Sequence, residues 1–318
     1  MDRNLALDFV RATEAAALSS ARWVGRGDNH AADKAAVEAM RKVFSVIPIR
    51  GTVVIGEGER DEAPMLYIGE KVGSNEGPEM DIAVDPLEGT NLTARGDFNS
   101  ITVLAAAPKG MLLHAPDTYM DKIAVGKEAK GVVDLDASPE ENILAVAKKL
   151  DKDPQDLTVI IMDRDRNQHY IDAARKVGAR IRLIRDGDVA GAIATALPDS
   201  GVDLLMGIGA APEGVLAAAA LKCLGGDIQG RLKCRNDEEK ERAKKMGIKD
   251  VECKLSMNDM VKGDSVIFAA TGVTDGTILR GVRFRSHGAT THSIVMRSKS
   301  RTVRMIEADH YFDTKPEW

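Results

Sequence analysis

Aromatic residues, cysteines and long apolar runs are all scarce in this chain of 318 residues. Aromatics make up only 4% of it and the formal net charge is −5, so the chain lacks the basic surface and stacking side chains typical of general nucleic-acid binders. No apolar run approaches the ~18 residues that a membrane-spanning helix needs. Asp2 and Asp8 interrupt the region where a signal peptide would be basic and then apolar. We therefore expect no nucleic-acid partner and no membrane partner.

The few cysteines and histidines form no recognisable metal or nucleophile motif. Cys223, Cys234 and Cys253 cannot all pair within the chain, and their spacing matches no zinc pattern. We interpret them as reduced thiols and expect a cytoplasmic protein. The sequence contains no G-x-S-x-G elbow, no G-x-x-x-x-G-K-[ST] loop and no H-E-x-x-H helix. These absences exclude the common serine-hydrolase, P-loop and zinc-protease chemistries.

The overall composition and the pattern of apolar residues are typical of a globular α/β protein. The chain is 44% hydrophobic and 29% charged, and its length suggests two domains at roughly 150 residues each. We expect helices over 4–23 and from Asp28 or Asn29 onward, the second with a buried stripe at Val37, Met40, Phe44 and Ile47. In the same half we expect strands at 52–56, 81–85, 101–107 and 111–115, the last two as a pair around the Lys109-Gly110 turn.

The pattern changes after residue 157. Compact apolar strands at 158–162, 180–184 and 203–206 are each followed by a polar or glycine-rich loop and a helix, which predicts a parallel sheet. We place the domain boundary near residue 150, with an α+β domain at 1–150 and a parallel α/β domain at 151–318. Strands after residue 265 are expected to close the fold. Ligands of such sheets gather at the carboxyl ends of the strands.

Five carboxylates stand where side chains point inward or where elements meet. Asp33 falls on the apolar face of the second helix, where an uncompensated charge is costly. Glu57, Asp85 and Glu88 follow strands, and Glu213 begins a helix after a glycine-rich loop. Neighbouring strands lie only ~4.8 Å apart, so carboxylates at their ends can converge, and they would then repel one another. An all-oxygen ligand set favours Mg²⁺ or Mn²⁺ over zinc as the cation that relieves this repulsion.

The segment Asp85-Pro-Leu-Glu-Gly-Thr90 adds geometry to this group. Pro86 fixes the turn out of the strand, and Gly89 permits close approach of the backbone to an anion. Thr90 offers a hydroxyl that could orient or activate an attacking water. Phosphoryl transfer needs cations at the phosphoryl oxygens together with an activated nucleophile. The sequence therefore favours metal-dependent phosphoryl transfer, although each acidic loop taken alone is equally typical of a solvated turn.

These residues also resemble a known family. Asp85–Thr90 resembles the D-P-[IL]-D-G-[TS] signature of the lithium-sensitive, metal-dependent phosphatases. Several longer motifs in the same order are similar to the class II fructose-1,6-bisphosphatases of bacteria: Gly25–Asp28, Gly56–Glu59, Asp61–Glu70, Asp81–Thr90, Ala211–Gly214 and Lys299–Thr302. The resemblance runs along essentially the whole chain. It implies a layered α-β-α-β-α sugar-phosphatase fold, with a metal-binding first domain and a sugar-phosphate-binding second domain.

The resemblance also implies residue roles and cofactors. It implies two Mn²⁺ or Mg²⁺ sites, one held by Asp33 and Glu57 and the other by Asp85, Glu88 and Glu213. Thr90 would activate the attacking water, with Asp61 as a nearby catalytic helper. The implied substrate contacts are Glu88, Gly89, Thr90, Tyr119, Arg164, Asp165, Arg166, Asp186, Gly187, Asp188 and Ala210. Position 29 is Asn and position 210 is Ala, where the family often has Lys and some members have Gly.

The activity implied is hydrolysis of the 1-phosphate of fructose 1,6-bisphosphate, as in gluconeogenesis. Family members that also hydrolyse sedoheptulose 1,7-bisphosphate look alike in these motifs, so a bifunctional enzyme stays open. An inositol-phosphate monophosphatase ranks lower, because Arg164 and Arg166 would then lack a second phosphate. A non-catalytic regulator that binds sugar phosphates ranks lowest. A homo-oligomer, dimer or tetramer, is expected of such a metabolic enzyme.

Overall fold

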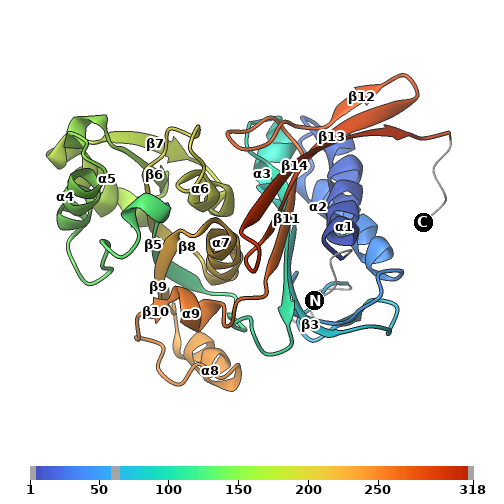
Figure 1. The fold of residues 1–318 in the computed structure, drawn as a ribbon, viewed down its shortest axis with the longest axis horizontal. Coiled ribbons are helices and arrows are strands. Elements are labelled where there is room, and N and C mark those ends of the chain that lie inside the picture. The colour runs from blue at the N-terminus through green and yellow to red at the C-terminus, as the bar shows by residue number, and fades with distance from the viewer. Residues whose placement is uncertain (1–4, 59–64, 314–318) are drawn as a thin grey trace. The chain divides into compact units, whose positions relative to one another are not determined.

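The computed structural model describes residues 5–58 and 65–313, which form two compact units (Figure 1). One unit comprises Met1–Leu112 with Asp264–Trp318, and the other comprises Leu113–Gly263. The sequence analysis divided the chain near residue 150 instead. The chain enters the second unit earlier because the strand Tyr119–Val125 pairs within the second sheet, and it returns because the strands from Ile267 onward pair within the first. Within the described residues, no helix is both long enough and apolar enough to span a bilayer.

The first unit pairs helices with a mixed sheet. Its helices are α1 (Leu5–Ser20), the 3₁₀ turn η1 (Ala21–Trp23), α2 (Asn29–Phe44) and α3 (Thr90–Arg95). Its strands are β1 (Arg50–Ile55), β2 (Lys71–Val72), β3 (Glu79–Glu88), β4 (Ile101–Pro108), β11 (Ile267–Gly272), β12 (Arg283–Arg285), β13 (Gly288–Arg297) and β14 (Thr302–Tyr311). The strand order is β12-β13-β11-β4-β3-β1-β2, with β14 on the free side of β13. β1 and β3 run parallel, so the ends of both strands meet at one edge.

The two long helices of this unit form where they were expected. The Asp28 side chain caps α2 by accepting a hydrogen bond from the Ala31 backbone N–H at 2.9 Å. Val37, Met40 and Phe44 of the expected stripe are buried in the core with apolar residues of α1 and of the sheet. Ile47 is buried as well but lies beyond the helix, which ends at Phe44. α1 packs on both α2 and the sheet. This packing orients α2, and therefore Asp33, against the sheet.

A chain of buried hydroxyls links α1 to the sheet. The Thr271 hydroxyl on β11 shares hydrogen bonds with the hydroxyls of Thr13 on α1 and Ser293 on β13, both at 2.8 Å. The Thr102 hydroxyl on β4 donates to the Thr13 carbonyl at 2.9 Å. All four side chains are fully buried. Because buried hydroxyls are costly when unpaired, this chain holds α1 at one position on the sheet.

The second unit is a sheet between two helical layers. Its helices are η2 (Lys127–Ala129), α4 (Pro139–Lys149), η3 (Pro154–Asp156), η4 (Asp165–Asn167), α5 (Gln168–Val177), α6 (Asp188–Ala194), α7 (Ala211–Leu224), α8 (Asp237–Lys245) and α9 (Met257–Met260). Its strands are β5 (Tyr119–Val125), β6 (Thr158–Met162), β7 (Arg180–Ile184), β8 (Leu204–Ala210), β9 (Asp227–Lys233) and β10 (Leu255–Ser256). The strand order is β10-β9-β5-β8-β6-β7.

The expected parallel sheet forms the centre of this unit. β6 pairs in parallel with β7 and with β8, and the three strands are followed by α5, α6 and α7 as the sequence predicted. α4 and α5 share the apolar cluster on one face, whereas a side chain added at Gly191 of α6 would touch Leu205 and Ile160 on the other. The α/β class is thus confirmed.

Three strand expectations need correction. The segment 111–115 forms no strand, because β4 already pairs with β3 on one side and β11 on the other. β5 and β9 were not anticipated at all. Both pair antiparallel and extend the parallel centre on the side of β8. The second sheet is therefore mixed.

Replacing Thr271 with valine tests the buried hydroxyl chain. The substitution keeps the side-chain shape but leaves the Thr13 and Ser293 hydroxyls without their shared partner, so we expect the free energy of unfolding to fall by about 1–3 kcal/mol. Thr302→Val, half-buried on β14, should change it by less than about 0.5 kcal/mol. Urea unfolding measures both variants. Equal stabilities for Thr271→Val and the wild type would contradict the role assigned to the chain.

Candidate functional site

The turn that follows Asp85 is shaped by its own sequence. The pairing of β3 with β4 shifts register between Asp85 and Glu88, and Pro86 occupies the bulge, where no ladder donor is needed. The Asp85 carboxylate accepts a hydrogen bond from the Leu87 backbone N–H at 3.1 Å. Gly89 then adopts a left-handed conformation with φ 84°, which favours glycine and leads directly into α3. The bulge thus places Asp85, Glu88 and the first residue of α3 within one turn.

Ser100 stabilises this turn through two hydrogen bonds of its hydroxyl. Its hydroxyl donates to the Glu88 carbonyl at 3.1 Å and shares a hydrogen bond with the Thr93 hydroxyl at 2.6 Å. Ser100 is fully buried and Glu88 is buried, whereas Thr90 at the start of α3 remains partly exposed. The turn therefore presents the Thr90 hydroxyl from a rigid base.

Asp33 and Glu57 approach the turn from two other elements. Glu57 follows β1, where its backbone N–H donates to the Leu66 carbonyl at 3.0 Å. A side chain at Gly56 would come within 1.9 Å of that same carbonyl oxygen, so only glycine fits there. The protonated Glu57 carboxyl donates a hydrogen bond to the Asp33 carboxylate on α2. Asp33 and Glu57, which the resemblance assigns to one metal site, therefore lie in contact, and their role as metal ligands stays a prediction.

Burial and mutual repulsion dominate the electrostatics of this group. Burial first, and then the negative charges of Asp33 and Asp85, raise the pKa of Glu57 to about 9. Burial also raises the pKa of Asp33, although the hydrogen bond from Glu57 opposes this effect. At neutral pH a proton is therefore held between carboxylates. A metal cation that binds these carboxylates would displace that proton.

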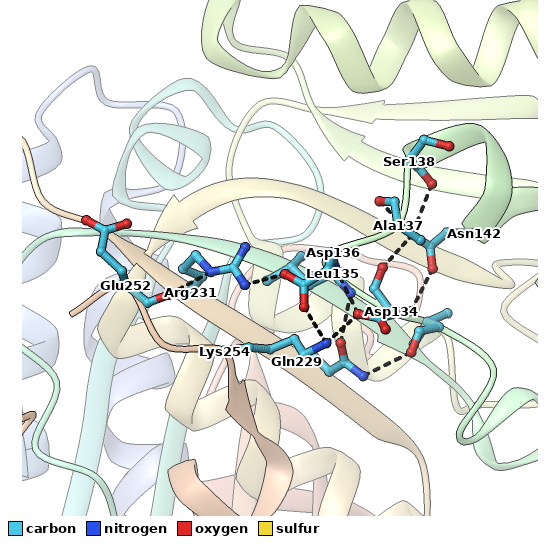
Figure 2. Close-up of polar contacts among 11 residues, drawn as sticks. Asp134, Leu135, Asp136, Ala137, Ser138, Asn142, Gln229, Arg231, Glu252 and Lys254 are labelled. Carbon is cyan, nitrogen blue, oxygen red and sulfur yellow. Dashed lines mark hydrogen bonds and ion pairs between the residues drawn. The ribbon is translucent and has the colours of Figure 1, made fainter. Parts of the chain in front are cut away.

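Another acidic cluster shows the opposite behaviour. In the second unit, Asp134 and Asp136 lie beside Lys254 and Arg231 (Figure 2). The Lys254 ammonium lies 2.7 Å from the Asp136 carboxylate, and the Arg231 guanidinium donates to it as well. These hydrogen bonds lower the pKa of Asp136 to about 2. This cluster already contains its own cations, whereas the pKa values of Asp33 and Glu57 are raised rather than lowered.

The carboxylates around Asp33 have the chemistry to bind a hard divalent cation, although the side chains that the structure describes do not surround a cation position. Their donors are carboxylate oxygens, the ligands that Mg²⁺ and Mn²⁺ prefer. Over residues 5–58 and 65–313, no three His, Cys, Asp or Glu side chains are grouped tightly enough to hold a metal ion as they stand. Glu213 lies half-buried in the first turn of α7 in the second unit. Asp61 falls outside the described residues.

The predicted substrate contacts of the second unit converge at the ends of its strands. Tyr119, the first residue of β5, is the direct cross-strand partner of Ala210 at the end of β8. Arg164 follows β6, and its guanidinium donates to the Asp186 carboxylate, which follows β7, at 2.7 Å. The Arg166 side chain donates from Nε to the Ile208 carbonyl at 2.9 Å. Polar groups from β5, β6, β7 and β8 therefore meet at one edge of this sheet.

Two further predicted contacts in these loops are Gly187 and Asp165, and their structural roles differ. Gly187 takes a left-handed conformation with φ 91° and leads into α6, so it shapes the turn that carries Asp188. Asp165 is exposed at the start of η4, beside the two arginines.

A buried ion pair holds two of these loops together. The Lys122 ammonium on β5 donates to the Asp188 carboxylate and, at 2.9 Å, to the Ala210 carbonyl. The two side chains are only 3% and 9% exposed. A side chain at Gly209 would come within 2.2 Å of an Asp188 oxygen and 2.9 Å of the Lys122 ammonium nitrogen, so glycine is needed there. Lys122 thus joins the loop after β7 to the end of β8.

Sequence reasoning did not identify Lys122, Asn167 or Arg235. Asn167 is fully buried, and its side-chain amide donates to the Met162 carbonyl at 3.0 Å and accepts from the Ile208 backbone N–H at 2.7 Å. Arg235 lies beside the Tyr119 ring. The one available signal was a lysine directly before the apolar run Ile123-Ala-Val125, because a charge inside such a strand calls for a partner.

Comparison with known proteins places this arrangement in context. The family model described as bacterial fructose-1,6-bisphosphatase, glpX-encoded, matches residues 3–310. A relative from Synechococcus sp. (strain JA-3-3Ab), named D-fructose 1,6-bisphosphatase class 2/sedoheptulose 1,7-bisphosphatase, is 48% identical over 98% of this chain and 97% of its own. A relative from Haemophilus influenzae, named fructose-1,6-bisphosphatase class 2, is 48% identical over 98% of both chains.

Lys122→Met tests the buried pair. The variant leaves the Asp188 carboxylate buried without its cation, so we expect it to lose about 3–5 kcal/mol of unfolding free energy. Lys127→Met is a matched control, because the Lys127–Glu128 pair is 63% and 60% exposed and contributes about 0–1 kcal/mol. Urea unfolding of both variants gives the comparison. Two variants of equal stability would show that the pair does not join the loops.

Proposed function

The chain belongs to the bacterial, glpX-encoded fructose-1,6-bisphosphatase family, and on this basis we propose that it removes the 1-phosphate of fructose 1,6-bisphosphate. As a member it is a phosphatase that depends on a divalent metal and takes a sugar bisphosphate as substrate. The proposed products are fructose 6-phosphate and phosphate, a step of gluconeogenesis. A cytoplasmic location and a homo-oligomeric state, dimer or tetramer, remain predictions.

We propose two Mn²⁺ or Mg²⁺ sites. Asp33 and Glu57 would hold one ion, and Asp85, Glu88 and Glu213 are the predicted ligands of the other. Divalent cations, when bound, stabilise the negative charge that builds on the phosphoryl oxygens. The observation that supports this assignment is the contact between the Asp33 and Glu57 carboxyls beside Asp85, where burial and the neighbouring negative charges raise the pKa of Glu57.

The other predicted residues divide between chemistry and binding. The Thr90 hydroxyl would orient the attacking water from the rigid base of α3, and Asp61 stays a predicted helper. Gly89 brings the backbone close to the phosphate of the substrate, together with Glu88. The remaining substrate contacts proposed are Tyr119, Arg164, Asp165, Arg166, Asp186, Gly187, Asp188 and Ala210.

Sedoheptulose 1,7-bisphosphate is a second candidate substrate. It is favoured by two Synechococcus relatives, each 48% identical, whose names include both bisphosphatase activities. The two substrates share the phosphorylated end that would meet the carboxylates and differ in the length of the sugar. Comparison of kcat/KM for the two bisphosphates separates a bifunctional enzyme from a specific one.

Thr90→Ala tests the assignment directly. Removal of the hydroxyl that orients the water should lower kcat for phosphate release from fructose 1,6-bisphosphate about 10²- to 10⁴-fold. Thr52→Ala, a threonine on β1 whose hydroxyl accepts a hydrogen bond from Lys71, should keep wild-type activity. Phosphate release is measured across a panel of sugar phosphates, with Mn²⁺ and Mg²⁺ supplied separately. Full activity of Thr90→Ala with either metal would overturn the proposed role.

A further inference from the structure

The Tyr119 ring is approached by two arginines from different parts of the second unit. The guanidinium carbon of Arg166 lies 4.5 Å from the ring centroid, and that of Arg235 lies 5.3 Å from it. Arg166 comes from the loop after β6, whereas Arg235 precedes α8. Cation–π attraction accounts for either arginine singly, but two cations at one neutral ring repel each other. Glu239 already balances the charge of Arg235, so an anion that joins the two arginines is attracted chiefly by Arg166.

Arg235 is held in place by a buried carboxylate. Glu239 is 5% exposed, and it accepts hydrogen bonds from the Arg235 Nε at 2.5 Å and from the Arg235 backbone N–H at 2.7 Å. The same carboxylate accepts from the Thr118 hydroxyl at 2.5 Å. Because Thr118 directly precedes Tyr119, these contacts fix Arg235 relative to the ring. The Arg235 side chain is nevertheless 53% exposed, so solvent reaches it.

The two guanidinium groups are anchored in the same manner. Arg166 donates from Nε to the Ile208 carbonyl, and Arg235 donates from Nε to Glu239. Each guanidinium carries four more N–H donors on its two Nη atoms, at the far end of the side chain. This planar fork matches the oxygens of a phosphate group, which it binds by paired, charge-assisted hydrogen bonds.

We propose that Arg235 acts with Arg166 and Tyr119 to bind the phosphate of the substrate that is not cleaved. Arg235 lies outside the residues that the sequence resemblance implied, and it acts as a specificity-determining residue that favours bisphosphates over monophosphates. The phosphate dianion offsets the charge of Arg166 and accepts hydrogen bonds from the Nη atoms of both arginines. This inference rests on the proposed function, because it assumes a substrate with a second phosphate.

The test compares Arg235→Ala with the wild type on fructose 1,6-bisphosphate and on fructose 1-phosphate. The ratio of kcat/KM for the bisphosphate to kcat/KM for the monophosphate should fall about 10- to 100-fold, mainly through KM for the bisphosphate. Arg235→Lys should recover part of this loss, since it restores the charge without the fork. Lys245→Ala, which removes an exposed charge from α8, is the matched control and should leave the ratio unchanged.

Two further measurements keep the outcomes distinct. Loss of the Arg235–Glu239 pair is expected to lower the urea midpoint, so a single cooperative urea transition, complete only above the assay conditions, shows that each variant is folded when it is assayed. Calorimetry compares the binding of fructose 1,6-bisphosphate to the wild type and to Arg235→Ala, and it decides the inference even if neither protein releases phosphate. Absence of phosphate release from the wild type would reject the proposed function instead. An unchanged specificity ratio together with unchanged binding would overturn the role of Arg235.

Discussion

The site depends on one electrostatic conflict, the crowding of partly buried carboxylates where α2 meets the ends of β1 and β3. Asp33, Glu57 and Asp85 cannot all be ionised there at a reasonable free energy, and the raised pKa of Glu57 measures that cost. The fold nevertheless enforces the crowding. The buried hydroxyls fix α1, α2 packs against α1 through its apolar stripe, and the bulge fixes the Asp85 turn. Such repulsion between buried carboxylates supports the cation site that we propose.

The second unit handles charge in the opposite way. Its buried Lys122–Asp188 pair is internally neutral and serves to join two loops, whereas Arg164, Arg166 and Arg235 gather positive charge at the edge of the sheet. One unit therefore presents acidic groups suited to metal ions, and the other presents basic groups suited to phosphate.

The sequence was most informative where local chemistry dictates the structure. Pro86 and Gly89 predicted the turn, Asp28 predicted the cap of α2, and a carboxylate on an apolar stripe identified Asp33. The sequence was least informative where a side chain contacts a residue far away along the chain. β5 was missed because Asp121 and Lys122 interrupt its apolar pattern, and Lys122 is acceptable there only through Asp188, 66 residues away. Arg235 is similar, since only the fold brings it to Tyr119. The segment 111–115 was overpredicted because β4 was already paired on both sides.

The most direct measurement of the central claim is the thermal stability of metal-free protein titrated with Mn²⁺. If the crowded carboxylates form a cation site, saturating Mn²⁺ should raise Tm by about 5–10 °C. Glu57→Gln should lose most of this shift, whereas Asp136→Asn, in the acidic cluster that already has its own cations, should keep it. A Tm that does not respond to Mn²⁺ in the wild type, or that rises equally in Glu57→Gln, would contradict the account.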